Sequence, residues 1–373
     1  MNQYDKRISV IGIGKLGLCF ALTLENSGFG VMGVDLDKNY ITKLNNKTLQ
    51  SSEPNLESYL KSSKKFKATT SIKKSVEFSN ILFLFVATPS LESGCYDHSQ
   101  IKSVVSQLKS LGEQKKQKHL IIGCTTMPGY CDFVQKELKQ LGYTVSYNPE
   151  FIAQGSILKD LVNPDVLLIG EGNKLAGEEI ESIYSCILKK NPTIHRMSRK
   201  EAEISKIALN CFLTTKIAFA NMIGDIAQLS GCDPAKILNS IGSDSRVGKK
   251  YLKYGFGFGG PCLPRDNKAL AIFANEIGVN PLISNASDKS NAEHLKHQIT
   301  HFTQNNSKID PVNISGVTYN LNTEIIEESQ QFEFAIALAK SGFKVVIEES
   351  ENVVKEIKKL HPNLFEYKFF AKL

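Results

Sequence analysis

One cysteine, Cys262, stands in the stretch YGFGFGGPCLPRDNKAL, which holds four glycines before it and Arg265, Asp266 and Lys268 after it. The reactive form of cysteine is the thiolate, which neighbouring cations favour. Glycines add no side chain that would obstruct the approach to the thiol, and Asp266 can orient a reactant or accept a proton. The stretch therefore predicts a nucleophilic cysteine, and the alternative interpretation is a buried structural thiol.

A second polar set could handle protons. Glu203, Lys206 and Asn210 fall at i, i+3 and i+7, so a helix would place them on one face. The alternative is a solvated helix face, but the neighbouring segments IALN and IAFANMI are apolar. A lysine that is desolvated in such surroundings can serve as a base.

A glycine-rich turn near the amino terminus predicts a dinucleotide site. The strand-like segment RISVIG breaks into GIGKLG (residues 12–17), a helical segment follows, and the next strand-like run ends in Asp35. In this pattern the three glycines allow a tight turn, close approach of a pyrophosphate and close packing of helix on strand. The amino terminus of the helix then presents N–H groups to the phosphates.

Asp35 favours NAD over NADP, because a carboxylate can accept from both ribose hydroxyls and repels a 2′-phosphate. Lys38 lies close by in the sequence and leaves NADP open. An NAD site also gives a nucleophilic cysteine a use: the thiol adds to an aldehyde, and the thiohemiacetal is oxidised to a thioester that water hydrolyses. The predicted cofactor-binding residues are Gly12, Gly14, Lys15, Leu16, Gly17, Asp35, Lys38, Thr88 and Thr126.

Alternating strand-like and helical segments must position these residues. Further strands are expected within residues 80–90, 118–129 and 143–151, with helical segments between them. The alternation predicts a parallel, doubly wound sheet, in which ligands bind beyond the carboxyl ends of the strands. The residues at such ends are Thr88, Thr126 and Glu150.

The second half of the chain has a different pattern. From residue 199 a helical pattern of about thirty residues ends at Gly231, and its apolar residues on several faces predict packing against another helix, most simply in a homodimer. Strand, helix and strand are expected between residues 311 and 349. We therefore predict an α/β fold in three parts. They are an N-terminal Rossmann NAD domain (1–195), a central helical dimerisation domain with the long helix (196–295) and a smaller C-terminal α/β domain (296–373).

Composition narrows the class of protein. The chain has 373 residues, 42% of them hydrophobic, and a net charge of +7, which suits a globular protein of two or three domains. Its lysine runs lack interleaved aromatic residues, so we expect a small polyanionic ligand and no nucleic acid. The eight cysteines show no metal-ligand spacing, so no metal is expected. Without a visible signal peptide or an apolar run of about 18 residues, we expect a cytosolic protein with no membrane contact.

Several motifs, in this order, resemble those of the UDP-glucose/GDP-mannose dehydrogenase family over residues 6–300, and more weakly beyond. They are GIGKLG, VATPS, TTMPG, NPEFIAQGSILKDL, EISKIALN and, the most specific, GFGGPCLPRD. The resemblance implies a four-electron oxidation of a nucleotide sugar, whose C6 hydroxyl becomes an aldehyde and then a carboxylate, with two NAD and one water. UDP-glucose is the leading substrate, and N-acetylhexosamine and GDP-mannose substrates are the alternatives.

The resemblance also implies roles for individual residues. Cys262 is similar to the covalent nucleophile of the family. Lys206 is similar to the group that handles the hydroxyl proton or stabilises the oxyanion, with Asn210 as its hydrogen-bonding partner. Asp266 is similar to the acid that positions the catalytic water together with Lys206.

Other residues are implied to serve the cofactor and the sugar. Thr126 resembles the threonine that binds water near the nicotinamide, and Glu150 resembles a base for thioester hydrolysis. The C-terminal domain and the loop RVGKKYLKYGFGFGG are expected to bind the sugar nucleotide. The implied substrate-binding residues are Glu150, Phe151, Gln154, Lys206, Asn210, Arg246, Tyr251, Leu252, Tyr254 and Gly259.

The chain departs from the family pattern at Gln154, at two positions of the C-terminal domain, and in the short length expected for that domain. Gln154 stands in place of a second glutamate and can hold a water but cannot take its proton. Asn320 and Glu327 stand in place of a lysine and an arginine, which would weaken UDP binding by about 1.5–3 kcal/mol for each lost charge-assisted hydrogen bond. Two further hypotheses therefore stay open: a catalytically impaired relative that binds NAD and nucleotide sugar, and a single-oxidation dehydrogenase of the β-hydroxyacid type.

Overall fold

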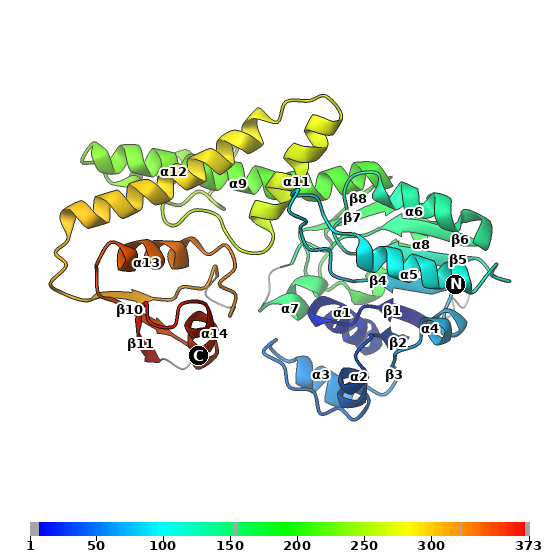
Figure 1. The fold of residues 1–373 in the computed structure, drawn as a ribbon. Helices are drawn as coiled ribbons and strands as arrows, with labels where there is room; N and C mark the ends of the chain where they lie inside the picture. Colours follow the sequence, from blue (N-terminus) through cyan, green and yellow to red (C-terminus); the bar gives the residue numbers. More distant parts are fainter. Residues whose placement is uncertain (1–6, 153–154, 321–322, 370–373) are drawn as a thin grey trace. The chain divides into compact units, whose positions relative to one another are not determined.

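The computed structural model describes residues 7–152, 155–320 and 323–369 (Figure 1). The chain divides into two compact units, residues 1–206 and 207–373, and each unit is described by itself. The second unit combines helices of the predicted central domain with the C-terminal sheet. The predicted division into three domains stays a prediction.

The first unit is built on an eight-stranded sheet with the order β3-β2-β1-β4-β5-β6-β7-β8. The first six strands in this order are parallel, as predicted, and follow the order of the dinucleotide-binding fold. Beyond them β7 pairs with β6 in the antiparallel direction, in a part of the sheet for which the sequence analysis makes no strand prediction. The strands are β1 (Arg7–Ile11), β2 (Gly30–Val34), β3 (Phe66–Thr69), β4 (Ile81–Leu84), β5 (Lys118–Ile122), β6 (Tyr143–Tyr147), β7 (Val166–Glu171) and β8 (Thr193–Ser198).

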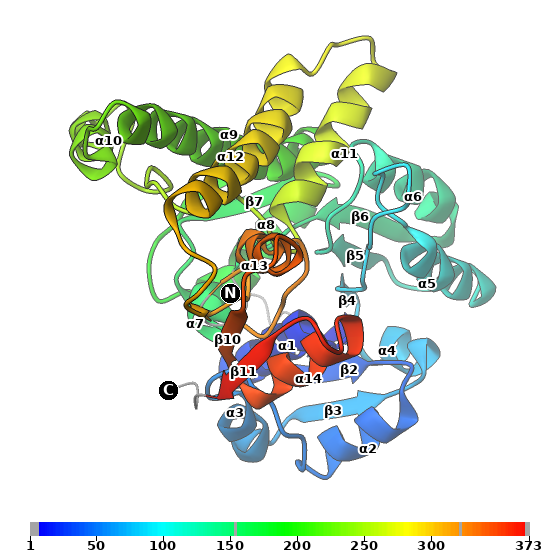
Figure 2. The same cartoon turned by 60° about the vertical axis from the view of Figure 1, so that its left-hand side comes forward.

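Helices cover both faces of this sheet (Figures 1 and 2). Within β4, Phe83 belongs to one apolar core and Leu82 and Leu84 to the other, as the alternation of side chains along a strand requires. The first core is closed by α1 (Lys15–Asn26), α2 (Lys38–Asn45), α3 (Leu56–Ser62), α7 (Ile157–Val162) and α8 (Lys174–Ile187). The second is closed by α4 (Ile72–Phe78), α5 (Ser99–Ser110) and α6 (Tyr130–Leu138), which the 3₁₀ turn Lys139–Leu141 follows.

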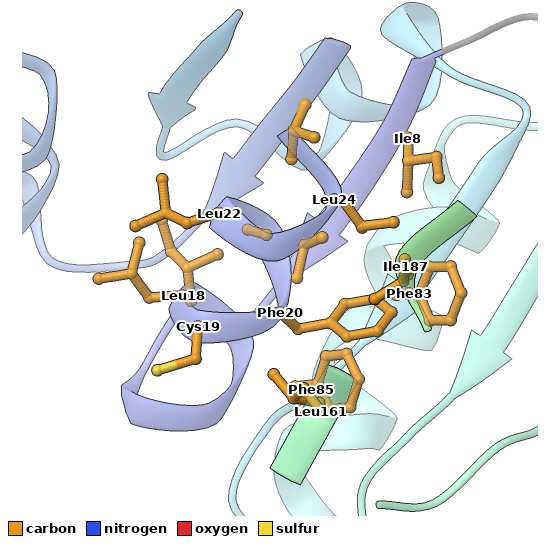
Figure 3. Packing of buried hydrophobic residues seen from close by; sticks show 14 of the residues in the cluster. Ile8, Leu18, Cys19, Phe20, Leu22, Leu24, Phe83, Phe85, Leu161 and Ile187 are labelled. Atoms are coloured by element: carbon orange, nitrogen blue, oxygen red, sulfur yellow. The ribbon is translucent and has the colours of Figure 1, made fainter. Parts of the chain in front are cut away.

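Helix α1 is almost wholly apolar along its buried face, and this fixes the turn that precedes it. Figure 3 shows Leu18, Leu22 and Phe20 of α1 directed into the first core. The ring of Phe20 lies 4.7 Å from that of Phe83 and 5.1 Å from that of Phe85. Burial of a ring of this size is worth about 3–5 kcal/mol relative to alanine, so the start of α1 is held firmly against the sheet.

The long helix α9 (Arg199–Leu229) confirms the helix predicted from residue 199 onward. It is the helix within the described residues that is long and apolar enough to cross a membrane, with a mean hydropathy of 1.3 over an 18-residue window that is 39% buried. One such helix is a weak indication, because the core helix of a soluble protein meets the same criterion. The predicted absence of membrane contact stays a prediction.

The second unit contains most of α9, five further helices among the described residues and a small sheet (Figure 2). The sheet has the order β11-β10-β9, and both strand pairs are parallel. The predicted strand, helix and strand are confirmed as β9 (Val312–Ser315), α13 (Gln330–Lys340) and β10 (Val345–Glu349). The remaining elements are α10 (Pro234–Ser243), α11 (Leu263–Glu276), α12 (Leu282–Asn305), α14 (Glu351–Leu360) and β11 (Glu366–Phe369).

Candidate active site

The glycine turn of the first unit has the geometry that its sequence predicts. Gly12 has a φ of +84°, and an added Cβ would lie 2.3 Å from the carbonyl oxygen of Phe85. At Gly17 an added Cβ would lie 1.9 Å from the carbonyl oxygen of Gly12. The tight turn and the close helix packing are therefore confirmed, because both positions exclude any side chain.

Gly14 differs from the other two glycines, because no atom lies within 4 Å of the position that its Cβ would take. It is the N-cap of α1, where it provides no side-chain cap, and the first turn of α1 holds no acidic residue. Lys15 is exposed and Leu16 packs partly into the first core. This helix end offers backbone N–H groups and a positive dipole to an anion, which fits a dinucleotide pyrophosphate.

The predicted ribose-binding acid lies at the carboxyl end of the second strand, β2. Asp35 follows β2 directly, and its Oδ1 accepts from the Asp37 backbone N at 3.1 Å. Lys38 is exposed at the start of α2. Tyr40, which the sequence analysis did not identify, donates from its hydroxyl to the Ile13 carbonyl at 2.8 Å and so braces the glycine turn.

Thr126 is buried, and it meets a carboxylate from α9. Its hydroxyl donates to Glu203 Oε1 at 2.8 Å. Glu203 also accepts from the Cys131 backbone N at 2.8 Å and from the Gly129 backbone N at 2.6 Å. Burial raises the pKa of Glu203, and these hydrogen bonds oppose that rise. Glu203 therefore serves the amino terminus of α6, and its carboxylate does not share the polar helix face predicted for it.

Two other residues lie in the segment that follows β4 and are buried to different degrees. Thr88 is buried after β4. His98, which the sequence analysis missed, stacks on Tyr130 with ring centroids 3.7 Å apart, and its Nε2 accepts from the Met127 backbone N at 3.2 Å. Burial lowers the pKa of His98 to about 4, so the ring is neutral and can accept this bond.

Lys206, Glu150 and Phe151 lie together in the first unit. Lys206 Nζ donates to the backbone oxygen of Glu150 at 3.0 Å and lies 4.5 Å from the centre of the Phe151 ring. The hydroxyl of Tyr184, another residue that the sequence analysis missed, donates to Glu150 Oε1. Burial raises the pKa of Glu150 to about 7, and the Tyr184 hydrogen bond and the Lys206 charge oppose the rise. Gln154 lies outside the described residues.

In the second unit, Cys262, Asp266 and Asn210 form the other polar group. Cys262 is exposed and is the N-cap residue of α11. Asp266 follows one turn later and is buried, and its Oδ2 accepts from Asn210 Nδ2 at 2.6 Å. The thiol therefore lies at the positive end of a helix dipole, where negative charge is stabilised. Asp266, which the sequence analysis expects to act beside the thiol, lies on the first turn of the same helix, where its backbone N donates to the Cys262 carbonyl at 2.9 Å.

The glycines before Cys262 do not all leave space, and this corrects the sequence interpretation. Only at Gly255 is the Cβ position open. An added Cβ would lie 2.2 Å from Asn291 Oδ1 at Gly257 and 2.1 Å from the Glu328 carbonyl oxygen at Gly259. At Gly260, which has a φ of +80°, it would lie 2.3 Å from the ring of Tyr319. Three of these four glycines thus let the segment pack closely on its own unit.

The other predicted sugar-binding residues lie in different surroundings. The side chain of Arg246 is 87% exposed and pairs with Asp244 at 2.7 Å. Tyr251 is exposed with a φ of +62°, whereas Leu252 is buried in a small apolar core. The Tyr254 hydroxyl donates to Asp225 at 3.0 Å. The structure thus leaves Arg246 and Tyr251 exposed, and uses the side chains of Leu252 and Tyr254 for internal packing.

The structure also shows the surroundings of Asn320 and Glu327, the two C-terminal positions at which the chain departs from the family pattern. The backbone oxygen of Asn320 accepts from Thr318 and Thr323 hydroxyls at 3.0 Å, so it closes a turn. Glu327 is exposed. Across residues 7–152, 155–320 and 323–369, the structure has no group of three or more His, Cys, Asp and Glu side chains arranged to hold a metal ion.

Comparison with known proteins extends these observations. The model of the NAD binding domain of the UDP-glucose/GDP-mannose dehydrogenase family matches residues 6–188, and that of the central domain matches residues 200–293. The UDP-glucose 6-dehydrogenase of Pseudomonas aeruginosa is 30% identical over 354 residues, which cover 91% of this chain and 78% of that protein. The GDP-mannose 6-dehydrogenase of the same organism is 30% identical over 355 residues, 91% of this chain and 80% of that protein.

Solved structures show the same fold. A UDP-glucose dehydrogenase from Pyrobaculum islandicum superposes with a TM-score of 0.88 at 26% identity, over 98% of this chain and 87% of that chain. A GDP-mannose dehydrogenase from Pseudomonas aeruginosa gives a TM-score of 0.60 at 27% identity, over 97% and 88%. The doubly wound sheet and its glycine turn are those of a dinucleotide-binding domain, and the family matches make the chain an NAD-dependent oxidoreductase. The chain belongs to the UDP-glucose/GDP-mannose dehydrogenase family, a family of NAD-dependent nucleotide-sugar 6-dehydrogenases.

Proposed function

We propose that the chain oxidises the C6 hydroxyl of a nucleotide sugar to a carboxylate, and that UDP-glucose is its substrate. The observation that carries this proposal is the position of Cys262 at the start of α11, one turn before the Asp266–Asn210 pair. A reaction that stopped at one oxidation would have no need of an exposed thiol at a helix amino terminus. The similarity to relatives named UDP-glucose 6-dehydrogenase supports this choice of sugar, and the equally similar GDP-mannose 6-dehydrogenase makes GDP-mannose the substrate to test against it.

The first unit would supply cofactor binding. The open side of Gly14 and the uncapped start of α1 fit the pyrophosphate, and Asp35 is placed after β2 to accept from the adenosine ribose. When bound, NAD supplies the electron acceptor for each of the two oxidations. We propose Gly12, Gly14, Lys15, Leu16, Gly17, Asp35, Lys38, Thr88 and Thr126 as the residues that line this site.

Lys206 and Asn210 would act on the oxygen of the sugar. Lys206 is 8% exposed, so its ammonium group lies where a hydroxyl proton or an oxyanion would feel its charge strongly. Asn210 lies four residues later on the same helix, and its amide nitrogen already donates to Asp266. This leaves the amide oxygen of Asn210 to accept from the substrate or from water.

Cys262 would add through Sγ to the aldehyde carbon, with the hydroxyl oxygen of the adduct stabilised by donors near it. Oxidation of this thiohemiacetal gives a thioester, and attack of one water on its carbonyl carbon breaks the C–S bond and restores the thiol. Asp266, held by Asn210, would position that water. Glu150, whose pKa is about 7, would accept the proton that the water loses.

The proposed working form is a homodimer joined through α9. Six large apolar residues of this helix are exposed, and neighbouring ones are three, four or seven residues apart, so they lie along one side of the helix. An apolar stripe of this length on a soluble enzyme is normally covered, and a second copy of the same helix would cover it. The exposed residues are Leu209, Phe212, Phe219, Met222, Ile226 and Leu229.

The deciding experiment counts NADH released per molecule of sugar across UDP-glucose, GDP-mannose and UDP-N-acetylhexosamines. Two equivalents from UDP-glucose support the proposal, and two from another sugar correct its substrate. One equivalent would indicate a single-oxidation dehydrogenase. NAD binding without turnover of any sugar in the panel would indicate a relative that binds its ligands but does not catalyse.

A further inference from the structure

The loop of residues 254–258, here called the clamp loop, precedes Cys262 and is held by buried polar side chains. The backbone N of Gly255 donates to Asn221 Oδ1 at 3.1 Å. The Phe258 backbone N donates to Asn291 Oδ1 at 2.8 Å, and its carbonyl accepts from Asn291 Nδ2 at 2.9 Å. Asn221 lies on α9 and Asn291 on α12, so two helices of the second unit grip one loop.

His294 of α12 makes the most constrained contact with the clamp loop. It is 2% exposed, and its Nε2 lies 2.7 Å from the Gly255 carbonyl oxygen. Its Nδ1 lies 2.9 Å and 2.8 Å from the two carboxylate oxygens of Asp225 on α9. A backbone carbonyl can only accept, so Nε2 donates to Gly255, and Nδ1 joins the ring to the Asp225 carboxyl group by a second hydrogen bond. His294 therefore bridges the clamp loop and α9.

Other groups around this pair complete the arrangement. The Tyr254 hydroxyl donates to Asp225 Oδ1 at 3.0 Å, and its ring meets that of His294 at a centroid distance of 5.6 Å. His297 Nε2 lies 3.7 Å from Asp225 Oδ1 and 3.1 Å from Gln228 Oε1. Gln298 Nε2 donates to the Gly255 carbonyl at 3.1 Å. Figures 1 and 2 show α9 and α12 side by side, which brings these groups together.

The glycine content of the clamp loop explains why such a device is needed. Glycines lose more conformational freedom on ordering than other residues, so this segment would be mobile without fixed partners. If the loop is already ordered in the free protein, the entropic cost of ordering it does not reduce the affinity for substrate. The loop also continues directly into the start of α11, so its position sets the position of Cys262.

We propose that His294 and Asp225 are positioning residues, whose buried hydrogen-bonded contact fixes the clamp loop and through it the Cys262 end of α11. This inference rests on the proposed role of Cys262 as nucleophile. A buried polar contact of this kind selects one arrangement of the groups that it joins. Its loss should therefore loosen the clamp loop and, through it, weaken substrate binding.

Hydrogen–deuterium exchange of the full chain tests, without any substrate, whether His294 holds the clamp loop in place. In His294→Gln, one side chain donor must serve two acceptors, so exchange in peptides covering residues 254–262 should be about tenfold faster than in the wild type. His301→Gln is the matched control on the same helix, because within the described residues His301 contacts His297 and Gln228 rather than the loop itself. Unchanged loop exchange in His294→Gln would overturn the proposal.

A second pair of variants separates the hydrogen bond between Asp225 and His294 from simple packing. In Asp225→Asn the new amide can donate to Nδ1, so a neutral ring can still donate through Nε2 to Gly255, and we expect near wild-type loop exchange. Asp225→Ala removes that partner and should give the faster exchange of His294→Gln. Equal exchange in Asp225→Ala and wild type would also refute the clamp, even if His294→Gln failed to fold.

Kinetics then link the clamp to the reaction. With the sugar that the wild type oxidises, His294→Gln should raise KM about tenfold and leave kcat within about twofold, because the cost of ordering moves to the binding step. A fall in kcat with KM unchanged would contradict the positioning role. If no sugar is oxidised by the wild type, the proposed function fails, while the exchange data still decide whether the clamp exists.

Discussion

The carboxyl group of Glu150 has a pKa close to neutrality because opposing effects act on it. Burial is the largest influence and raises the pKa of its carboxyl to about 7. The hydrogen bond from Tyr184 and the charge of Lys206 act in the opposite direction, because both favour the carboxylate. A carboxyl that titrates near neutrality can take a proton from water during the reaction and return it to solvent afterwards.

This balance predicts a pH dependence. As a base, Glu150 must be ionised, so kcat for the full oxidation should rise with pH through about 7 and then level off. Glu150→Gln should lower kcat about 100-fold and flatten this limb. Tyr184→Phe removes the hydrogen bond that lowers the pKa, so the limb should move to higher pH. The measurement is kcat as a function of pH, and a shift of the limb to lower pH in Tyr184→Phe would contradict the assignment.

Cys262 gives a second prediction at the same scale. Cys262→Ser should abolish the release of two NADH per sugar, because serine has no sulfur to form the thioester and its hydroxyl is a much weaker nucleophile than a thiolate. Cys232→Ser is the matched control, since Cys232 is also exposed but lies between α9 and α10. The measurement is the number of NADH molecules released per sugar, followed by absorbance. A Cys262→Ser enzyme with unchanged four-electron turnover would refute the covalent mechanism.

At the scale of elements, the glycine turn allows two substitutions of one type to be compared. Gly17→Ala would place a methyl group 1.9 Å from a backbone oxygen that no rotamer change can move, so we expect the free energy of unfolding to fall by about 3 kcal/mol or more. Gly14→Ala meets no protein atom and should keep stability within about 1 kcal/mol. Its methyl group would instead occupy the proposed pyrophosphate position and weaken NAD binding about tenfold.

Denaturant unfolding and NAD titration of both variants provide the measurements. The outcome expected for Gly17→Ala is lost stability, and for Gly14→Ala it is lost affinity with normal unfolding. A Gly14→Ala protein that bound NAD as tightly as wild type would show that the pyrophosphate lies elsewhere.

The elements that could be predicted from the sequence are those with strong apolar periodicity. The strands β1 and β2, the helix α1 and the long α9 were predicted from such patterns, and the structure confirms them. The helix α12 was not predicted, because its buried face is polar: Ser284, Ser287, Asn291 and His294 are its buried residues. The edge strand β3 was hidden in a lysine run, where only one of its four residues is buried.

In the candidate site, too, features that depend on contiguous residues were predictable, and contacts between distant segments were not. The cofactor turn was predictable because its strand, turn, helix and acid are contiguous in the sequence. The partners of Glu203 and Glu150 were not, because Thr126 and Tyr184 come from distant segments that meet only in the folded unit. The role of the glycines before Cys262 was wrongly predicted for the same reason, since Asn291, Glu328 and Tyr319 fill the space beside them.

At the scale of the whole molecule, α9 combines chemistry with an uncovered apolar surface. Lys206 and Asn210 lie near its start, and the six exposed apolar residues named above extend to its end. A surface of this kind in water favours association, because each buried methylene is worth about 0.8 kcal/mol. A homodimer would therefore hold the helix that carries two proposed catalytic residues.

Disruption of this stripe should separate the subunits. Ile226 is 55% exposed on α9, and Ile226→Glu would place a charge within the proposed interface, which we expect to convert a dimer into a monomer at micromolar concentration. Leu360→Glu is the matched control, because Leu360 is 59% exposed at the end of α14. Light scattering coupled to size-exclusion chromatography gives the mass of each variant. A wild type that is monomeric, or an Ile226→Glu variant that stays dimeric, would show that another surface or no surface joins the subunits.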